Sequence, residues 1–166
     1  MSARCLLVSV LTLAVLSLPG DGIANDRTAI TSGALVGTWT LVSFEERRSH
    51  GETIYPMGPR PRGILIYDQA GTMSVQLMRD PSLRPLSADP RDSYYAYFGR
   101  YDVRAQEAAV VHHVEGSMRP GEIGVDYTRS VRLRGDRLIL GVSTTRTLTW
   151  QRIQQRSPRP VGGIQE

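Results

Sequence analysis

The stretch Leu35-Val-Gly-Thr-Trp-Thr-Leu-Val-Ser-Phe-Glu45 is rich in residue types that favour extended backbone. β-Branched and aromatic side chains such as threonine, valine, tryptophan and phenylalanine pack well on the pleated surface of a sheet. We therefore predict a strand over residues 37–45, with Leu35 as the start of the folded part of the chain.

Similar short runs follow as far as Ile153, and Gly, Pro, Asp or Asn separates each run from the next. No long stretch shows the apolar periodicity of a helix. The sequence therefore predicts an all-β domain over residues 35–153. Its further strands are expected at 62–68, 72–79, 96–103, 109–116, 126–134, 137–142 and 145–153.

Two of the predicted connections are tight turns. Asp68-Gln69-Ala70-Gly71 and Arg134-Gly135-Asp136 leave room only for hairpins, so consecutive strands should pair in antiparallel fashion. Eight such strands hide their edges best by closing into an up-and-down barrel, and an open sandwich is the alternative. The segment from Pro81 to Asp92 contains three prolines. It is expected to be either a lid over one barrel end or an irregular connection, with one helical turn near Asp89-Pro90.

The first 24 residues have the order of a cleavable signal peptide. Arg4 gives a positive start, Cys5 to Leu18 carries no charge, and the segment from Pro19 to Gly22 breaks the run. At about 1.5 Å per residue this run is too short to span a bilayer, so we expect no stable membrane insertion. We expect cleavage after Ala24, a periplasmic or secreted protein, a flexible lead-in over 25–34 and a flexible tail over 154–166.

Several kinds of chemistry are unexpected in the mature chain. The only cysteine, Cys5, leaves with the signal, so no thiol nucleophile, disulfide or cysteine metal site remains. The 20 basic residues form no basic stripe, which argues against nucleic-acid binding. Phosphate-loop, dinucleotide and nucleophile-elbow motifs are missing, so we expect no cofactor. We expect no bound metal either, because a catalytic zinc site needs three protein ligands and His50 is the only histidine besides His112 and His113.

Several blocks of this sequence resemble, in order, the bacterial and fungal lipocalin-like domain family, and they extend over roughly residues 35–153. The start Gly37-x-Trp39 is similar to the first strand of lipocalins. The other blocks are Tyr55-Pro-Met-Gly-Pro59, Arg62-Gly-Ile-Leu-Ile-Tyr67, Met73-Ser-Val-Gln-Leu-Met78, Tyr97-Phe-Gly-Arg-Tyr101 and His112-His-Val-Glu-Gly-Ser117.

The resemblance implies a small calycin-type barrel in which three residues have structural roles. Gly37 would let the first strand bend at the barrel floor, and Trp39 would plug that floor with a flat apolar surface. In lipocalins an arginine of the last strand packs across this tryptophan. Arg152 is the residue of this chain that can do so.

The candidate ligand-binding residues lie on neighbouring strands. Alternation places Ser74 and Gln76 on one face of their strand and Met73, Val75 and Leu77 on the other. If the polar set points inward, then Tyr67, Ser74, Gln76 and Tyr97 line a polar interior suited to a ligand with hydroxyl or carbonyl groups. If it points outward, the apolar set fills the core.

Two adjacent histidines, His112 and His113, point to opposite faces of one strand and therefore cannot ligate one metal ion. His113 and Glu115 share a face. They form either an acid–base pair in the interior or a hydrogen-bonded pair on the outer surface.

Three functions fit these observations. The first is an exported barrel that binds a small, partly polar organic ligand through Tyr67, Ser74, Gln76, Tyr97, His113 and Glu115. The second is a cofactor-free isomerase or cyclase that uses a His, Glu or Tyr as its acid or base, and the third is a filled barrel that acts as an interaction module. The sequence indicates neither the identity of a catalytic residue nor the oligomeric state.

Overall fold

The computed structural model describes residues 30–154 of the chain, which form a closed antiparallel barrel. Each barrel strand pairs with the next along the chain, and pairing between the first and last strands closes the sheet. The strands are β1 (Gly37–Arg47), β2 (Thr53–Ile54), β3 (Arg62–Tyr67), β4 (Thr72–Met78), β5 (Tyr94–Arg104), β6 (Ala109–Ser117), β7 (Asp126–Arg134), β8 (Arg137–Gly141) and β9 (Arg146–Arg152).

The predicted eight-stranded up-and-down barrel is confirmed, since every predicted strand has its counterpart in β1 and β3 to β9. The short strand β2 was not predicted; it pairs only with the last residues of β1. Within residues 30–154, no helix is both long and apolar enough to cross a membrane. The predicted signal peptide, residues 1–24, lies outside the described residues, as does the tail beyond residue 154.

A helical turn, α1 (Ser32–Leu35), precedes β1, and the hydroxyl of Thr31 caps it by accepting from the amide of Ala34. Leu35 and Ile30 are buried in the barrel core. The described part of the expected lead-in is therefore packed against the barrel, because these two apolar side chains anchor it.

Alternation along the strands separates the interior from the outer surface. On β4, Met73, Val75 and Leu77 are buried and face the interior. Their partners across the neighbouring strands include Leu65 and Tyr97, which are buried as well. The apolar set therefore decides which face of β4 points inward, because burying it removes the larger apolar area from water.

Trp39 closes the barrel floor, where β1 begins. Its side chain is fully buried, and its indole Nε1 donates to the carbonyl of Leu35 at 3.0 Å. The guanidinium of Arg152 lies over the indole ring and donates to the carbonyls of Val36 (2.6 Å) and Ala34 (2.7 Å). Gly37 has φ of +142°, and a Cβ there would lie 2.7 Å from Nη1 of Arg152. This position thus requires glycine.

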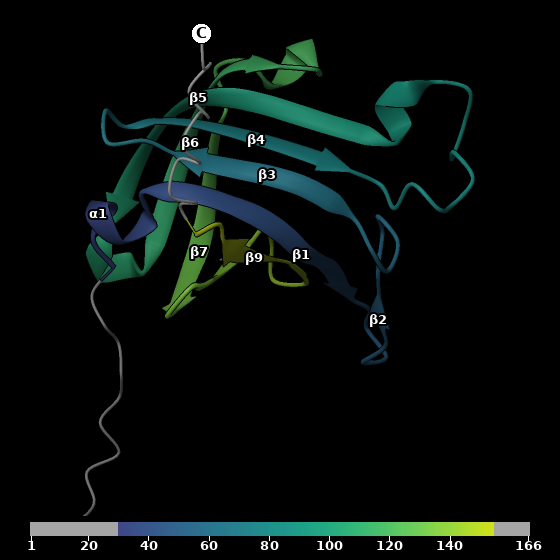
Figure 1. The fold of residues 1–166 in the computed structure, drawn as a ribbon, viewed down its shortest axis with the longest axis horizontal. Coiled ribbons are helices and arrows are strands. Elements are labelled where there is room, and N and C mark those ends of the chain that lie inside the picture. Colours follow the sequence, from purple (N-terminus) through teal and green to yellow (C-terminus); the bar gives the residue numbers. More distant parts are fainter. Residues whose placement is uncertain (1–29, 155–166) are drawn as a thin grey trace, which may run out of the picture.

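The opposite end of β1 carries β2 and the long connection between β4 and β5, which lie far from α1 (Figure 1). Asp80 anchors this connection: its buried carboxylate accepts from the amides of Arg60 and Ser82. Residues 81–88 are exposed, and the helical turn expected near Asp89-Pro90 is the 3₁₀ turn η1 (Pro90–Asp92).

Candidate functional site

The barrel interior contains a cavity of about 530 Å³. Its inner end is buried, since Tyr97, His112 and Trp150 are almost inaccessible to solvent. Its outer end is lined by the exposed residues Arg119, Ser143 and Arg146, so the cavity opens to solvent. Much of the wall is apolar and consists of Phe44, Val75, Leu77, Leu140, Leu148 and Trp150.

None of the described residues from 81 to 92 lines this cavity. The segment is therefore an irregular connection in this structure, and the lid alternative finds no contact to support it. Met57, from the neighbouring connection between β2 and β3, does line the cavity.

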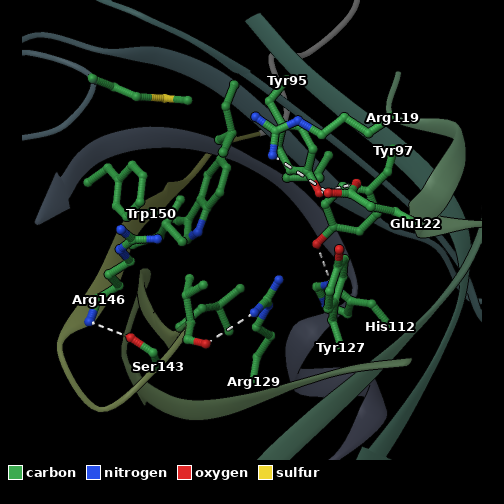
Figure 2. A pocket seen from close by; sticks show the side chains of 17 residues that line it. Tyr95, Tyr97, His112, Arg119, Glu122, Tyr127, Arg129, Ser143, Arg146 and Trp150 are labelled. Atoms are coloured by element: carbon green, nitrogen blue, oxygen red, sulfur yellow. Dashed lines mark hydrogen bonds and ion pairs between the residues drawn. The ribbon is translucent and has the colours of Figure 1, made fainter. Parts of the chain in front are cut away.

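His112 is the centre of a buried hydrogen-bonded group at the inner end of the cavity, and Figure 2 shows its bond to Tyr97. Its Nε2 lies 2.7 Å from the hydroxyl of Tyr67, and its Nδ1 lies 2.8 Å from the hydroxyl of Tyr97. The three residues come from β6, β3 and β5, which bring them together because their inward faces meet inside the barrel.

Burial controls the protonation of this group. It lowers the pKa of His112 to about 3, and the positive charges of Arg129 and His113 act in the same direction. Burial likewise raises the pKa values of Tyr67 and Tyr97 above the ordinary value for tyrosine. At neutral pH the imidazole and both phenols are therefore uncharged.

Glu122 belongs to a second polar group, nearer the cavity mouth. Its carboxylate accepts from the hydroxyls of Tyr95 (2.7 Å) and Ser117 (2.8 Å), and Arg119 lies 3.6 Å away. Partial burial alone would raise the pKa of Glu122, but these contacts outweigh it and hold the pKa below its ordinary value.

Arg129 projects into the cavity from β7, on the inward face that it shares with Tyr127 and Val131. Its guanidinium lies 4.6 Å from the centre of the Tyr127 ring, and Nη1 donates to the carbonyl of Val142 at 3.3 Å. Figure 2 shows it directed toward the hydroxyl end of Tyr97. Arg129 therefore supplies a positive charge to the inner cavity.

The structure places the candidate residues Tyr67 and Tyr97 inside the barrel and two others outside it. Ser74 is half-buried and Gln76 is exposed, on the face of β4 opposite Val75. Gln76 accepts from the hydroxyl of Tyr94 on the outer surface, at 2.9 Å. The inward orientation considered for Ser74 and Gln76 is thus corrected, because the apolar side chains of β4 occupy the interior.

His113 and Glu115 also lie on the outer side. His113 bonds to Asp126 through Nδ1 (2.7 Å) and to Asp102 through Nε2 (3.0 Å) rather than to Glu115. Glu115 is exposed at a bulge, where the pairing of β5 with β6 shifts between Phe98 and Gly99. An interior acid–base pair of His113 and Glu115 is therefore excluded by their position. The alternative of a hydrogen-bonded pair on the outer surface is right about the surface and wrong about the pairing, because His113 bonds to Asp126 and Asp102 instead.

Sequence reasoning missed His112, Arg129 and Trp150 as cavity residues. A sequence signal existed for His112 and Arg129, because each lies on the same strand face as apolar residues two positions away. Val110 and Val114 share a face with His112, just as Val131 shares one with Arg129. A polar residue at an apolar-face position of a barrel strand points inward.

Among residues 30–154, no cluster of three or more His, Cys, Asp or Glu side chains could hold a metal ion. The model of a family described as a lipocalin-like domain matches residues 36–158 of the chain. A search of curated proteins found no relative that matches.

Proposed function

The chain belongs to the lipocalin-like domain family, and we propose that its barrel binds a small, partly polar organic ligand in the interior cavity. The cavity carries this proposal. Its volume of about 530 Å³ falls within the range of about 300–1,000 Å³ in which proteins hold small organic molecules.

The lining supports a ligand that is apolar over most of its surface. Aliphatic and aromatic side chains form much of the wall, and a few polar groups converge at the inner end. This combination is typical of small-molecule sites, where apolar contacts supply binding energy and a few hydrogen bonds fix the orientation.

Binding is better supported than the two alternatives. A filled barrel that serves as an interaction module would leave no such cavity. Acid–base catalysis by His112 is disfavoured because both ring nitrogens are already hydrogen-bonded and burial lowers its pKa to about 3.

We also propose that the protein acts outside the cytoplasm, in the periplasm or as a secreted carrier. The order of charge, apolar run and small residues in residues 1–24 supports this proposal. Mass analysis of the exported product should find Asn25 at its amino terminus. Recovery of an intact species that begins at Met1, and only in the cytoplasm, would contradict the proposal.

Binding of 2-naphthamide, measured by isothermal titration calorimetry, tests the cavity. The Leu77→Trp variant places a bulky indole in the cavity. The control, Gln76→Trp, places the same indole on the outer face of the same strand. We expect Leu77→Trp to weaken binding at least tenfold and Gln76→Trp to leave it unchanged.

A second variant, Val142→Trp, obstructs the cavity from a half-buried position and covers the case in which Leu77→Trp fails to fold. Circular dichroism should report a native fold for each variant that is compared. Equal affinity in wild type and in a folded cavity variant would overturn the proposal. A wild type that binds neither 2-naphthamide nor its carboxylate analogue 2-naphthoate would overturn it as well.

A further inference from the structure

We propose that the ligand is an organic carboxylate whose anionic group is bound by Arg129 and by the hydroxyl of Tyr97, while its apolar body lies against the barrel wall. This inference rests on the proposed function and specifies the chemistry of the same cavity. Three observations carry it: the charge balance of the lining, the direction of the Tyr97 proton, and an unpartnered indole.

The first observation concerns the arginines that line the cavity. Arg119 lies 3.6 Å from Glu122, and Nε of Arg146 lies 2.7 Å from Glu46. Among residues 30–154, Arg129 forms no such ion pair. A half-buried guanidinium without a carboxylate partner is costly unless an anion compensates it. The inner cavity therefore favours a negatively charged group.

The second observation begins at Tyr67. Its hydroxyl is buried, and its only hydrogen-bond partner among the described residues is Nε2 of His112. If His112 donated to this oxygen, the proton of Tyr67 would be left buried without an acceptor, which is unfavourable. Tyr67 must therefore donate, and Nε2 of His112 accepts.

The proton of the neutral imidazole is consequently on Nδ1, which donates to the hydroxyl oxygen of Tyr97 at 2.8 Å. Tyr97 accepts this bond, so its own proton is directed elsewhere. Because Tyr97 lines the cavity, that proton is available to a ligand oxygen. The buried chain from Tyr67 through His112 thus orients Tyr97 as a donor.

The third observation is that the indole Nε1 of Trp150 is buried without a hydrogen-bond partner among the described residues, although Trp150 lines the cavity. The carboxylate of Glu122, by contrast, already accepts from Tyr95 and Ser117. The inner cavity therefore offers donors and a positive charge, which a carboxylate matches and an amine does not.

A matched pair of probes tests the proposal by calorimetry at constant ionic strength. 2-Naphthoate and 2-naphthamide have the same ring system and differ in charge. We expect the wild type to bind 2-naphthoate at least tenfold more tightly than 2-naphthamide, since a charged hydrogen bond is worth more than a neutral one.

Arg129→Gln should abolish this preference, because it weakens 2-naphthoate binding far more than 2-naphthamide binding. Circular dichroism should report a native fold for this variant. Arg129→Lys keeps the charge and should retain part of the preference. Arg132→Gln, on the exposed face of the same strand, is the control and should behave as wild type. Tyr97→Phe should weaken 2-naphthoate binding several-fold.

Equal affinity of the wild type for the two probes would overturn the inference and leave the proposed function standing. A preference that survives in Arg129→Gln would do the same. If the wild type binds neither 2-naphthoate nor 2-naphthamide, both the proposed function and the inference are overturned.

The direction of the proton has its own test in the ¹⁵N chemical shifts of His112. Protonated Nδ1 and unprotonated Nε2 are expected. The reverse tautomer would remove Tyr97 as a donor and overturn that part of the inference.

Discussion

Arg152, in the last barrel strand, lies with its guanidinium 4.0 Å from the centre of the Trp39 ring in the first strand. The two residues are paired across the seam where β9 meets β1 and closes the barrel. The same guanidinium binds the carbonyls of Ala34 and Val36, which hold the chain that enters β1. One side chain therefore connects the first and last strands of the barrel at its floor.

Arg152→Ala should lower the free energy of unfolding by about 2–4 kcal/mol. The change removes a cation–π contact and leaves two carbonyls without their donors. Urea unfolding measures the effect. Arg137→Ala, at an exposed arginine of β8, is the control and should change the free energy by less than about 0.5 kcal/mol. Similar small changes in both variants would show that the floor contact contributes little.

Gly37→Ala and Gly33→Ala should have effects of opposite sign. At Gly37 the added Cβ meets Arg152, and φ of +142° is strained for alanine, so we expect a loss of about 1–3 kcal/mol. At Gly33, in α1, nothing lies within 4 Å of the added Cβ, and alanine should add up to about 1 kcal/mol. Thermal and urea unfolding of the two variants provide the comparison. A neutral Gly37→Ala would contradict the described floor.

Tyr67→Phe should destabilise the protein by about 1–3 kcal/mol, because it leaves Nε2 of His112 buried without a donor. Tyr94→Phe removes a hydroxyl that bonds to Gln76 on the outer surface and should cost less than about 0.5 kcal/mol. Urea unfolding of both variants distinguishes the buried group from the exposed one. Equal costs would argue against a buried His112 group.

His113 should make stability depend on pH. Its hydrogen bond to Asp126 chiefly raises its pKa, and Asp102 adds to the effect. A histidine with a raised pKa in the folded state stabilises the fold fully below its unfolded pKa, near 6.5. That contribution is lost as the pH rises through the higher folded pKa.

His113→Gln should therefore reduce the free energy of unfolding more at pH 5.5 than at pH 8.5, and Asp126→Asn should diminish that difference. The effect is small because solvent screens this half-exposed side chain. Urea unfolding at the two pH values measures it, and a larger reduction at pH 8.5 would have the wrong sign.

The sequence predicted the barrel well because local signals determine it. Apolar and β-branched runs mark the strands, and the turn at Asp68 to Gly71 leaves no other pairing for β3 and β4. The short strand β2 gave no such signal, because two residues carry no periodicity.

The candidate site was predicted less well. We looked for the lining in the polar side chains that alternate with apolar ones along a strand, such as Ser74 and Gln76. The interior of β4 is instead apolar, and the polar groups enter singly, among valines, as His112 and Arg129 do. The bulge near Gly99 further changed the surroundings of Glu115, and nothing in the local pattern predicts a bulge there.

The indole signals of the two tryptophans provide the most direct test of ligand binding inside the barrel. Trp39 Nε1 bonds to Leu35 at the floor, whereas Trp150 lines the cavity with its Nε1 unpartnered. In a ¹H–¹⁵N spectrum, saturation with 2-naphthoate should shift the indole signal of Trp150 and leave that of Trp39 in place. If calorimetry shows that the protein is saturated with 2-naphthoate and the Trp150 signal still does not move, binding in the cavity is contradicted.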